Sequence, residues 1–219
     1  MRSRILLFPI FLLFFTSAIS QVTYDIPVYE DPDIGGMEYE DAMVFKDFFE
    51  HTNVGNMHVY PSSERNPTSD YYFHGEKIRR KWYKYFDRKW STAHSKRYTA
   101  YATYAITIGD DLHFLIRFEG RKYDNSIELF TLNRGVITHR QTLASYNYEL
   151  GIESQLDSWI QDFDRDTRKD ILKKFSINYY WKERPEEYTV LYKQLSDSDF
   201  EKNENMDVDT QDFIMHETK

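Results

Sequence analysis

The second half of the chain alternates apolar and polar side chains with the period of two that is typical of β-strands. Between residues 98 and 108 every residue of one parity is apolar or aromatic, namely Tyr98, Ala100, Ala102, Tyr104, Ile106 and Ile108. A Gly109-Asp110 turn and a second apolar run over 112–119 follow, which predicts a long β-hairpin. Later strands are predicted at 126–132, 136–148, around 159–160, at 171–181 and at 188–195. Six or seven strands joined by short connections favour an antiparallel meander.

One segment ahead of these strands has the period of an α-helix. Its apolar residues recur mainly at spacings of three and four over 76–94: Ile78, Trp82, Tyr85, Phe86, Trp90 and Ala93. The other faces carry basic residues, which we interpret as solvated: Arg79, Arg80, Lys84, Arg88 and Lys89. The expected fold class is therefore α+β, a predominantly antiparallel β-meander of six to seven strands with one amphipathic helix packed on it.

The first residues are typical of an export signal. Two arginines precede an uninterrupted apolar run over 5–15, and the small residues Ala18 and Ser20 precede a cleavage point at Gln21. We therefore expect residues 1–20 to be a signal peptide and the mature protein to be secreted or periplasmic. The apolar run is shorter than the ~20 residues that a spanning helix needs. No other stretch is long and apolar enough, so no transmembrane segment is expected in the mature chain.

Composition divides the rest of the chain into three parts. Residues 21–70 are acidic and mostly irregular, with a short helix predicted within 38–51. Residues 71–195 are expected to form the folded β-rich domain. Residues 196–219 are acidic and poor in apolar side chains, which predicts a disordered tail that docks at most through two side chains, Phe213 and Ile214.

The charge balance limits the kinds of binding partner, and the lack of cysteine limits how the fold can be stabilised. The chain holds 28 basic and 36 acidic residues, and without Arg2 and Arg4 the balance is 26 − 36 = −10. Such an acidic protein is not expected to bind nucleic acid. Since the chain has no cysteine, no disulfide stabilises it. A bound metal ion would therefore matter more as a structural staple.

A nine-residue acidic loop between two apolar runs is the strongest candidate for a site. Carboxylates occupy its positions 1, 3, 5 and 9: Asp162, Asp164, Asp166 and Asp170. Alternate side chains of a curved loop point the same way, so the first three converge and the fourth closes the far side. With the backbone carbonyl of Arg168 and water, they supply the six to eight oxygens that Ca²⁺ requires. We therefore expect a calcium site.

The run from Trp159 to Leu172 resembles the calcium loop of FG-GAP and VCBS-type repeats, which read D-x-D/N-x-D-G-x-x-D with a strand on each side. The resemblance covers this run only. It implies that the four aspartates are side-chain ligands and that Arg168 contributes its carbonyl. One copy of the motif is present, so the propeller that such repeats build elsewhere is not implied.

More loosely, residues 75–194 look like a group of small, uncharacterised bacterial secreted proteins. The likeness is carried by a D-N-x-I strand, here Asp124-Asn125-Ser126-Ile127, and by a D-S-W-I-x-D entry to the loop, here Asp157 to Asp162. That group has no agreed activity. The likeness therefore implies export and metal binding, and it implies no reaction.

The loop departs from the family pattern at one position. Position 6 is glycine in the family because the backbone there takes a positive φ, and here it is Thr167. A β-branched residue in that conformation costs on the order of 1–2 kcal/mol. An EF-hand is not expected, because its bidentate glutamate at position 12 would fall on Lys173 and no helices are predicted beside the loop. Without a metal, the loop would be an acidic turn paired to its own basic residues.

Three function classes follow from these features. The first is an exported, non-catalytic calcium-binding module of unknown partner, in which Ca²⁺ stabilises the strand–loop–strand at 158–172. The second is a secreted inhibitor or a glycan- or peptide-binding protein that acts on a protein or glycan of the cell envelope. Its candidate platform is a set of aromatic residues: Tyr101, Tyr146, Tyr148, Tyr179, Tyr180 and Trp181. The third is a hydrolase; no catalytic constellation is found in the sequence, so the chain is not expected to be an enzyme.

Overall fold

The computed structural model describes residues 36–88, 90–91, 97–121, 124–196, 199–204 and 208–218. The expected signal peptide, and most of the acidic segment after it, lie outside the described residues. In this part of the chain eleven strands form one mixed sheet, accompanied by the short helix α1 (Tyr39–Lys46), the 3₁₀-helix η1 (Arg80–Tyr85) and α-helical residues at 88 and 90–91. Among the described residues, no helix has the length and apolar character needed to cross a membrane.

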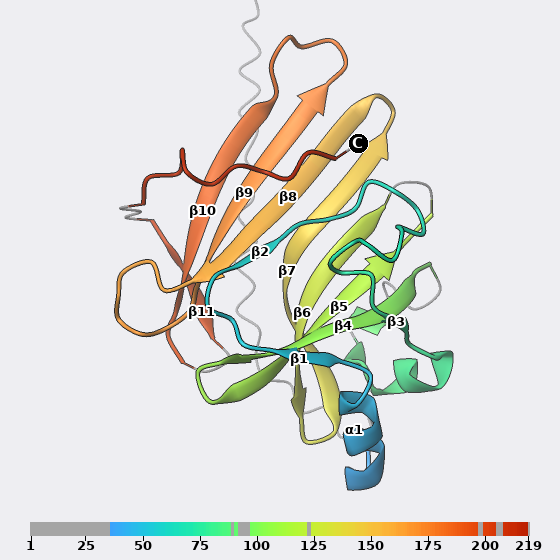
Figure 1. Cartoon of the computed structure of the whole chain (residues 1–219). Coiled ribbons are helices and arrows are strands. Elements are labelled where there is room, and N and C mark those ends of the chain that lie inside the picture. The colour runs from blue at the N-terminus through green and yellow to red at the C-terminus, as the bar shows by residue number, and fades with distance from the viewer. Residues whose placement is uncertain are drawn as a thin grey trace, which may run out of the picture. The chain divides into compact units, whose positions relative to one another are not determined.

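Seven long strands build the centre of the sheet in sequence order, each antiparallel to the next (Figure 1). They are β4 (Thr99–Ile108), β5 (Asp111–Glu119), β6 (Asn125–Asn133), β7 (Val136–Glu149), β8 (Ile152–Gln161), β9 (Asp170–Tyr179) and β10 (Glu186–Gln194). The short strand β11 (Phe200–Asn203) extends the sheet beyond β10, and β3 (Glu76–Lys77) pairs with β4. Six of these seven strands overlap the strands predicted from the sequence, whereas β8 begins at Ile152, seven residues before the strand expected around 159–160.

Two short strands near the N-terminus connect distant parts of the sheet. The strand β1 (Glu50–Thr52) runs parallel to β4, which makes the sheet mixed, and β2 (Met57–Val59) pairs antiparallel with the end of β8. Only residues 53–56 separate these two strands, so the chain passes directly from the edge of β4 to β8. In Figure 1 this segment crosses in front of the central strands.

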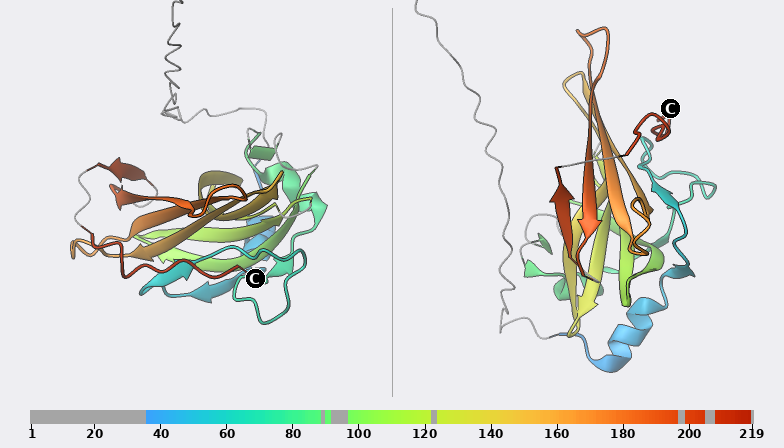
Figure 2. Two further views of the ribbon diagram at one scale, coloured as in Figure 1. Left: turned by 90° about the horizontal axis from the view of Figure 1, so that it is seen from above. Right: turned by 90° about the vertical axis from the view of Figure 1, so that its left-hand side faces the viewer.

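The sheet is buried on both faces, because two separate apolar clusters pack against it. The first cluster joins α1 and η1 to β4–β6 through large aromatic side chains: Phe45, Phe49, Trp82, Tyr85, Phe86, Trp90, Phe114, Phe118 and Phe130. The second cluster joins the 53–73 segment to the strands: Val54, Met57, Val59, Phe73, Tyr104, Ile106, Leu115, Ile127, Leu129, Ile160 and Ile171. The side view of Figure 2 shows η1 and the 53–75 segment on opposite sides of the sheet.

A β-bulge in β4 changes which side chains share a face. The pairing with β5 shifts between Ala102 and Ala105, so two residues of β4, Thr103 and Tyr104, lie opposite one residue of β5, Leu115. As a result Ala100 and Ala102 belong to the first cluster, whereas Ile106 and Ile108 belong to the second. Strict alternation would place all four on one face. The extra residue of the bulge reverses the parity.

The expected fold class is wrong in two respects. The structure has eleven strands in a mixed sheet in place of a meander of six to seven antiparallel strands. Over the described part of 76–94, it has β3, η1 and α-helical residues at 88 and 90–91 in place of one long amphipathic helix. The apolar stripe is real, since Ile78, Trp82, Tyr85, Phe86 and Trp90 are all buried in the first cluster.

Up to Asp87, the backbone of that segment does not form an α-helix, because two of its amides bond to the sheet. The amide of Ile78 donates to the carbonyl of Ala100 at 2.9 Å, and the amide of Asp87 donates to the carbonyl of Ile137 at 2.9 Å. Neither amide is then available to an i−4 carbonyl, which an α-helix requires. Ala93, the last residue of the predicted apolar face, lies outside the described residues.

The C-terminal segment, for which the sequence predicts disorder, contains ordered structure. After β11, residues 208–218 run across β10, β9 and β8, ending at the label C in Figure 1. Phe213 and Met215 pack on a third apolar cluster of Trp159, Leu172 and Leu191. Ile214 is 78% exposed.

Candidate metal centre

The acidic loop connects β8 to β9. The last residue of β8, Gln161, pairs with the first of β9, Asp170. Residues 162–169 therefore leave and re-enter the sheet at adjacent positions, and the loop is closed by the strand ladder. The ladder positions the two ends of the loop without help from a ligand.

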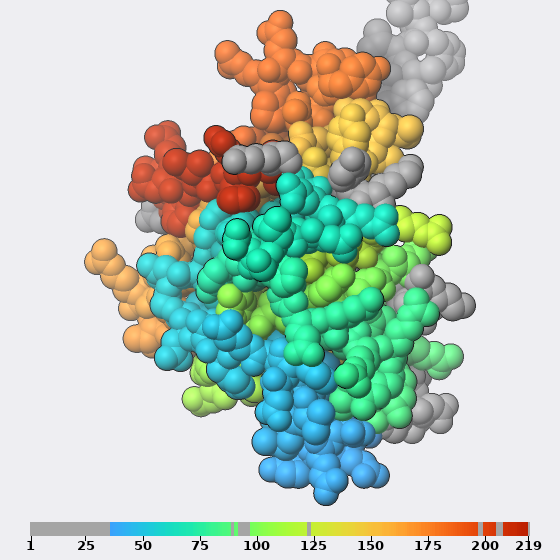
Figure 3. Space-filling model, turned by 45° about the vertical axis from the view of Figure 1, so that its right-hand side comes forward, coloured from blue at the N-terminus to red at the C-terminus, as the bar shows by residue number. Residues whose placement is uncertain are grey.

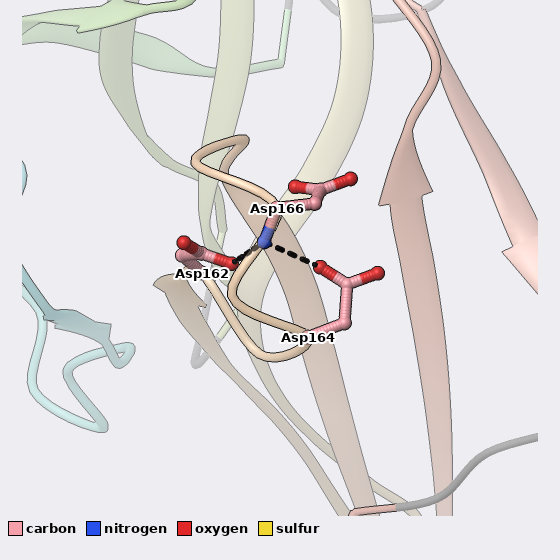
Figure 4. A group of neighbouring side chains, drawn as sticks. All are labelled: Asp162, Asp164 and Asp166. Atoms are coloured by element: carbon pink, nitrogen blue, oxygen red, sulfur yellow. Dashed lines mark hydrogen bonds between the residues drawn. The ribbon is translucent and has the colours of Figure 1, made fainter.

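Three of the candidate ligands lie together. One carboxylate oxygen from each of Asp162, Asp164 and Asp166 lies within 4.8 Å of the other two. In Figure 4 the amide of Asp166 lies between the other two carboxylates. It donates to Asp162 Oδ1 at 3.1 Å and to Asp164 Oδ1 at 3.3 Å. Asp162 Oδ2 accepts the amide of Thr167 at 2.9 Å, and Asp166 Oδ1 accepts the amide of Arg168 at 2.8 Å.

The loop backbone is strained at two positions. Thr167 has a φ of 75°, as the position of glycine in the motif predicts, and Arg165 has a φ of 64°. Neither residue adopts this left-handed region readily, and the β-branched Thr167 does so least. The loop therefore keeps the backbone shape of the motif although the residue that makes this shape easy is absent.

Asp170 differs from the other three carboxylates. It is 1% exposed, and its Oδ1 accepts the amide of Gln194 at 3.1 Å. Its Oδ2 is buried and has no hydrogen-bond partner. Burial raises the pKa of this carboxyl above its usual value and the negative charges of Asp164 and Asp166 raise it further, while the backbone amides of Gln194 and Phe163 oppose part of the rise. A buried oxygen without a donor is costly in a folded protein, and a cation is one way to satisfy it.

The structure also places beside the loop a lysine ammonium group that is not part of the sequence motif. Lys193 Nζ, from β10, donates to Asp164 Oδ2 at 2.5 Å. This contact lowers the pKa of Asp164 and raises the pKa of Lys193. Lys193 was not a sequence candidate, since only the pairing of β9 with β10 places it beside the loop.

Further bonds fasten the loop to β10 and the residue after it. The amide of Lys169 donates to Gln194 Oε1 at 2.8 Å, and Arg168 Nη1 donates to the carbonyl of Leu195 at 3.0 Å. Gln194 therefore contacts the loop at two points, through its side chain to Lys169 and through its amide to Asp170. Loop, β9 and β10 thus behave as one unit.

Of the six aromatic residues expected to form a platform, Tyr179, Tyr180 and Trp181 lie together, with the Trp181 ring centroid 5.1 Å from that of Tyr179 and 4.7 Å from that of Tyr180. Tyr101 lies on β4, where the guanidinium of Arg117 stacks 3.9 Å from its ring centroid. Tyr146 is buried and donates its hydroxyl to Glu153 at 2.9 Å. Tyr180 and Trp181 lie in the β9–β10 turn and are 79% and 56% exposed.

Comparison with known proteins returned no match: no family model matches the chain, and neither a curated protein nor a solved structure was found to be similar to it. The chemistry of the loop is therefore the main guide to function.

Proposed function

We propose that the chain is an exported, non-catalytic calcium-binding module, in which Ca²⁺ bound by the 162–170 loop fixes β8 and β9 to β10. One observation carries the proposal. Three carboxylates cluster in the loop, and Asp170, at the end of the loop and outside that cluster, has a buried oxygen without a hydrogen-bond partner. The three clustered groups supply negative charge, and the orphaned oxygen supplies a coordination position that no protein donor fills.

The donor set favours a hard cation. All four side chains offer carboxylate oxygen, and the chain has no cysteine to favour a soft metal. A loop of irregular backbone adapts to the six to eight ligands of Ca²⁺ more easily than to the strict octahedron of Mg²⁺. The carbonyl of Arg168 and water would complete the set, as in the motif that the loop resembles.

Calorimetric titration of the purified protein with CaCl₂ tests the proposal directly. We expect saturable binding of one Ca²⁺ and a rise in melting temperature, because an ion that binds only the folded chain stabilises it. The double variant Asp164→Ala/Asp166→Ala should lose both effects. The matched control is Asp110→Ala, which removes an exposed carboxylate from the β4–β5 turn. Absence of both heat and stabilisation at millimolar Ca²⁺ in the unaltered protein would contradict the proposal.

A second candidate function is binding of a glycan or peptide of the cell envelope. It is favoured by exposed apolar side chains at two neighbouring turns, since the amide of Tyr180 donates to the carbonyl of Gly151 at 3.1 Å. Leu150 is 87% exposed and lies in the same pair of turns as Tyr180 and Trp181. Capture of one dominant partner from envelope extract, lost in Tyr180→Ala/Trp181→Ala, would support it. Equal capture by that variant would refute it.

A further inference from the structure

One short segment concentrates positive charge in an otherwise acidic protein. Five of the eight residues 77–84 are basic and none is acidic, whereas the whole chain has a formal charge of −8. The helical pattern predicts a solvated face for Arg79, Arg80 and Lys84. In the structure the basic residues fall into two groups with different surroundings. Figure 3 shows the segment, in green, at the surface beside α1, in blue.

The first group lies on aromatic rings of the segment itself. Lys81 Nζ is 4.7 Å from the ring centroid of Trp82, and Lys84 Nζ is 4.6 Å from that of Tyr85. The electron-rich face of an aromatic ring attracts a cation. These two lysines therefore have a role within the segment and do not require a ligand.

The second group lines a pocket between the β3–η1 connection and the start of β4. Its basic residues are Lys77, Arg79 and Arg80, and no described acidic residue lines it. Its volume is about 380 Å³, near the lower end of the range for small-molecule sites, roughly 300–1,000 Å³. Two bonds fix its walls. The amide of Ile78 donates to the carbonyl of Ala100 at 2.9 Å, and the amide of Ala100 donates to Tyr83 Oη at 2.8 Å.

The cations of this pocket have no partner within the described part of the chain. Neither an ion pair nor a side-chain hydrogen bond joins Lys77, Arg79 or Arg80 to another described residue. Their positive charge is therefore not compensated by a neighbouring carboxylate. A recess lined by charge of one sign attracts small ions of the opposite sign.

Tyr83 adds a neutral donor to the pocket. Its hydroxyl oxygen accepts the amide of Ala100, so the hydroxyl hydrogen is left to donate, and no described residue accepts it. Burial raises the pKa of Tyr83, whereas the amide of Ala100 and the charge of Arg80 oppose part of the rise. The hydroxyl is therefore protonated at neutral pH, and it lies within the field of the Arg80 guanidinium.

Tyr98 and Ile78 give the pocket an apolar wall. The hydroxyl of Tyr98 donates to Asp124 Oδ2 at 2.5 Å, so this donor is already used, and Ile78 is 1% exposed. Asp124 itself does not line the pocket. A ligand that fits therefore carries a negatively charged group beside an apolar part.

We propose that this pocket binds the phosphate group of a phosphomonoester. Such a group presents three terminal oxygens and nearly two negative charges at pH 7, which match three cations and the Tyr83 hydroxyl. A carboxylate has fewer oxygens and a single charge, and would leave part of this set unpaired. Arginine also forms bidentate hydrogen bonds with phosphate. The organic part of the ester lies against Tyr98 and Ile78. The site shares no residue with the calcium loop, so either proposal can fail without the other.

Calorimetric titration of the purified protein with phenyl phosphate and with benzoate, at equal ionic strength, tests the choice of group. The two probes share an aromatic ring and differ in the charged group. We expect saturable binding of phenyl phosphate, at least about ten-fold tighter than that of benzoate, the equivalent of one hydrogen bond to a charged group. No saturable binding of phenyl phosphate, or equal affinity for the two probes, would overturn the proposal.

The double variant Arg79→Gln/Arg80→Gln removes two cations of the pocket and should weaken the binding of phenyl phosphate at least about ten-fold. The matched control is Lys81→Gln/Lys84→Gln, which removes the same charge from the same segment and alters no residue that lines the pocket. The control should bind as the unaltered protein does. An equal loss in both variants would show that a diffuse basic surface attracts the anion, and would overturn the assignment to the pocket.

A measurement on the unaltered protein covers the case in which the arginine variant fails to fold. Phenyl phosphate should shift the amide resonances of residues 77–83 and 98–100. Shifts confined to other residues would overturn the proposal.

Vesicles of phosphatidylcholine with phosphatidic acid distinguish the two sources of such a phosphate group. Retention of the protein that glycerol 3-phosphate reverses would place the group on a lipid. Absence of retention, with phenyl phosphate still bound, would place it on a soluble compound. Both results uphold the site, whereas retention that glycerol 3-phosphate does not reverse would overturn it.

Discussion

The ammonium of Lys193 lies 2.5 Å from Asp164 Oδ2, so β10 supplies a positive charge to the same loop that is proposed to hold Ca²⁺. The bond raises the pKa of Lys193, and both side chains are partly exposed. The lysine therefore competes with a divalent cation for one ligand oxygen. It also explains how a loop with clustered carboxylates is held closed when no metal is bound.

Replacing Lys193 by methionine should strengthen calcium binding. The substitution keeps the length and apolar stem of the side chain and removes the competing charge. We expect the affinity for Ca²⁺ to rise about two- to five-fold, the range expected for an exposed ion pair. Calorimetry gives the dissociation constant. The matched control is Lys202→Met, which alters an exposed lysine of β11. An equal gain in calcium affinity there would show that the net charge of the protein causes the effect, and not the contact with Asp164.

Thr167→Gly should stabilise the protein and tighten the metal site together. The φ of 75° at this position is unfavourable for threonine and open to glycine. Relief of this strain is worth on the order of 1 kcal/mol, seen as a higher midpoint in chemical unfolding. Leu150→Gly is the matched control, because Leu150 also has a positive φ, 52°, in the turn at the other end of β8. Leu150→Gly should stabilise the fold without changing the affinity for calcium. If the affinity changes in this control as well, the gain in Thr167→Gly does not come from the metal loop.

The acidic loop shows which parts of a site local sequence determines. Asp162, Asp164 and Asp166 come together because alternate residues of one short loop face the same point, and the positive φ of Thr167 follows from its place in the motif. Lys193 and the orphaned oxygen of Asp170 depend on the pairing of β9 with β10. Nothing in the spacing of residues along the chain reveals that pairing.

The fold shows the same division between local and distant causes. Sequence patterning located six of the seven long strands, whereas of β8 it indicated only the end around 159–160. It did not reveal the bulge of β4, at which Ala102 and Ile106 come to face different clusters. Nor did the apolar pattern of 76–94 reveal that the backbone before residue 88 is not α-helical, because the competing bonds of Ile78 and Asp87 go to strands far along the chain.

Asp170→Asn should stabilise the metal-free protein and weaken calcium binding. Because the folded pKa of Asp170 is raised above its usual 3.8, the folded state holds the proton more tightly than the unfolded state. Its contribution to stability is thus present at low pH and is lost as pH rises through the raised pKa. Asparagine keeps the acceptor for the amide of Gln194 and removes the charge. Unfolding titrations between pH 3 and 7 without Ca²⁺ should show a smaller loss of stability with rising pH in the variant, and an unchanged profile would contradict the assignment.

Lys173 should make stability increase with pH in the mildly alkaline range. It is 6% exposed, and burial lowers its pKa from 10.5 to about 8. Between these values the unfolded state binds more protons, so the free energy of unfolding rises with pH. Lys173→Met should remove this slope and raise stability at pH 7 by up to about 3 kcal/mol, the equivalent of the pKa shift. Chemical unfolding at pH 7, 8 and 9 measures both the stability and its dependence on pH. Lys77→Met, which alters an exposed lysine, is the control. If stability still rises with pH in Lys173→Met, other groups cause the rise.

Calcium binding and docking of the C-terminal segment should be coupled through Phe163. This residue lies between two proposed ligands, Asp162 and Asp164, and its ring centroid is 5.5 Å from that of Phe213. An ion that fixes the loop also fixes the ring on which Phe213 packs. We expect Ca²⁺ to slow amide exchange in residues 208–218 at least about five-fold, near the lower end of measured couplings between sites.

Since coupling is reciprocal, Phe213→Ala should weaken calcium binding by the same factor, whereas Ile214→Ala should not. Phe163→Ala distinguishes coupling from direct ligation, because its side chain offers no oxygen to the metal. In that variant Ca²⁺ should still bind, and its effect on exchange in the C-terminal segment should disappear. If Ca²⁺ slows exchange there equally in Phe163→Ala, the two sites communicate through β10, whose residues Lys193 and Gln194 contact the loop directly.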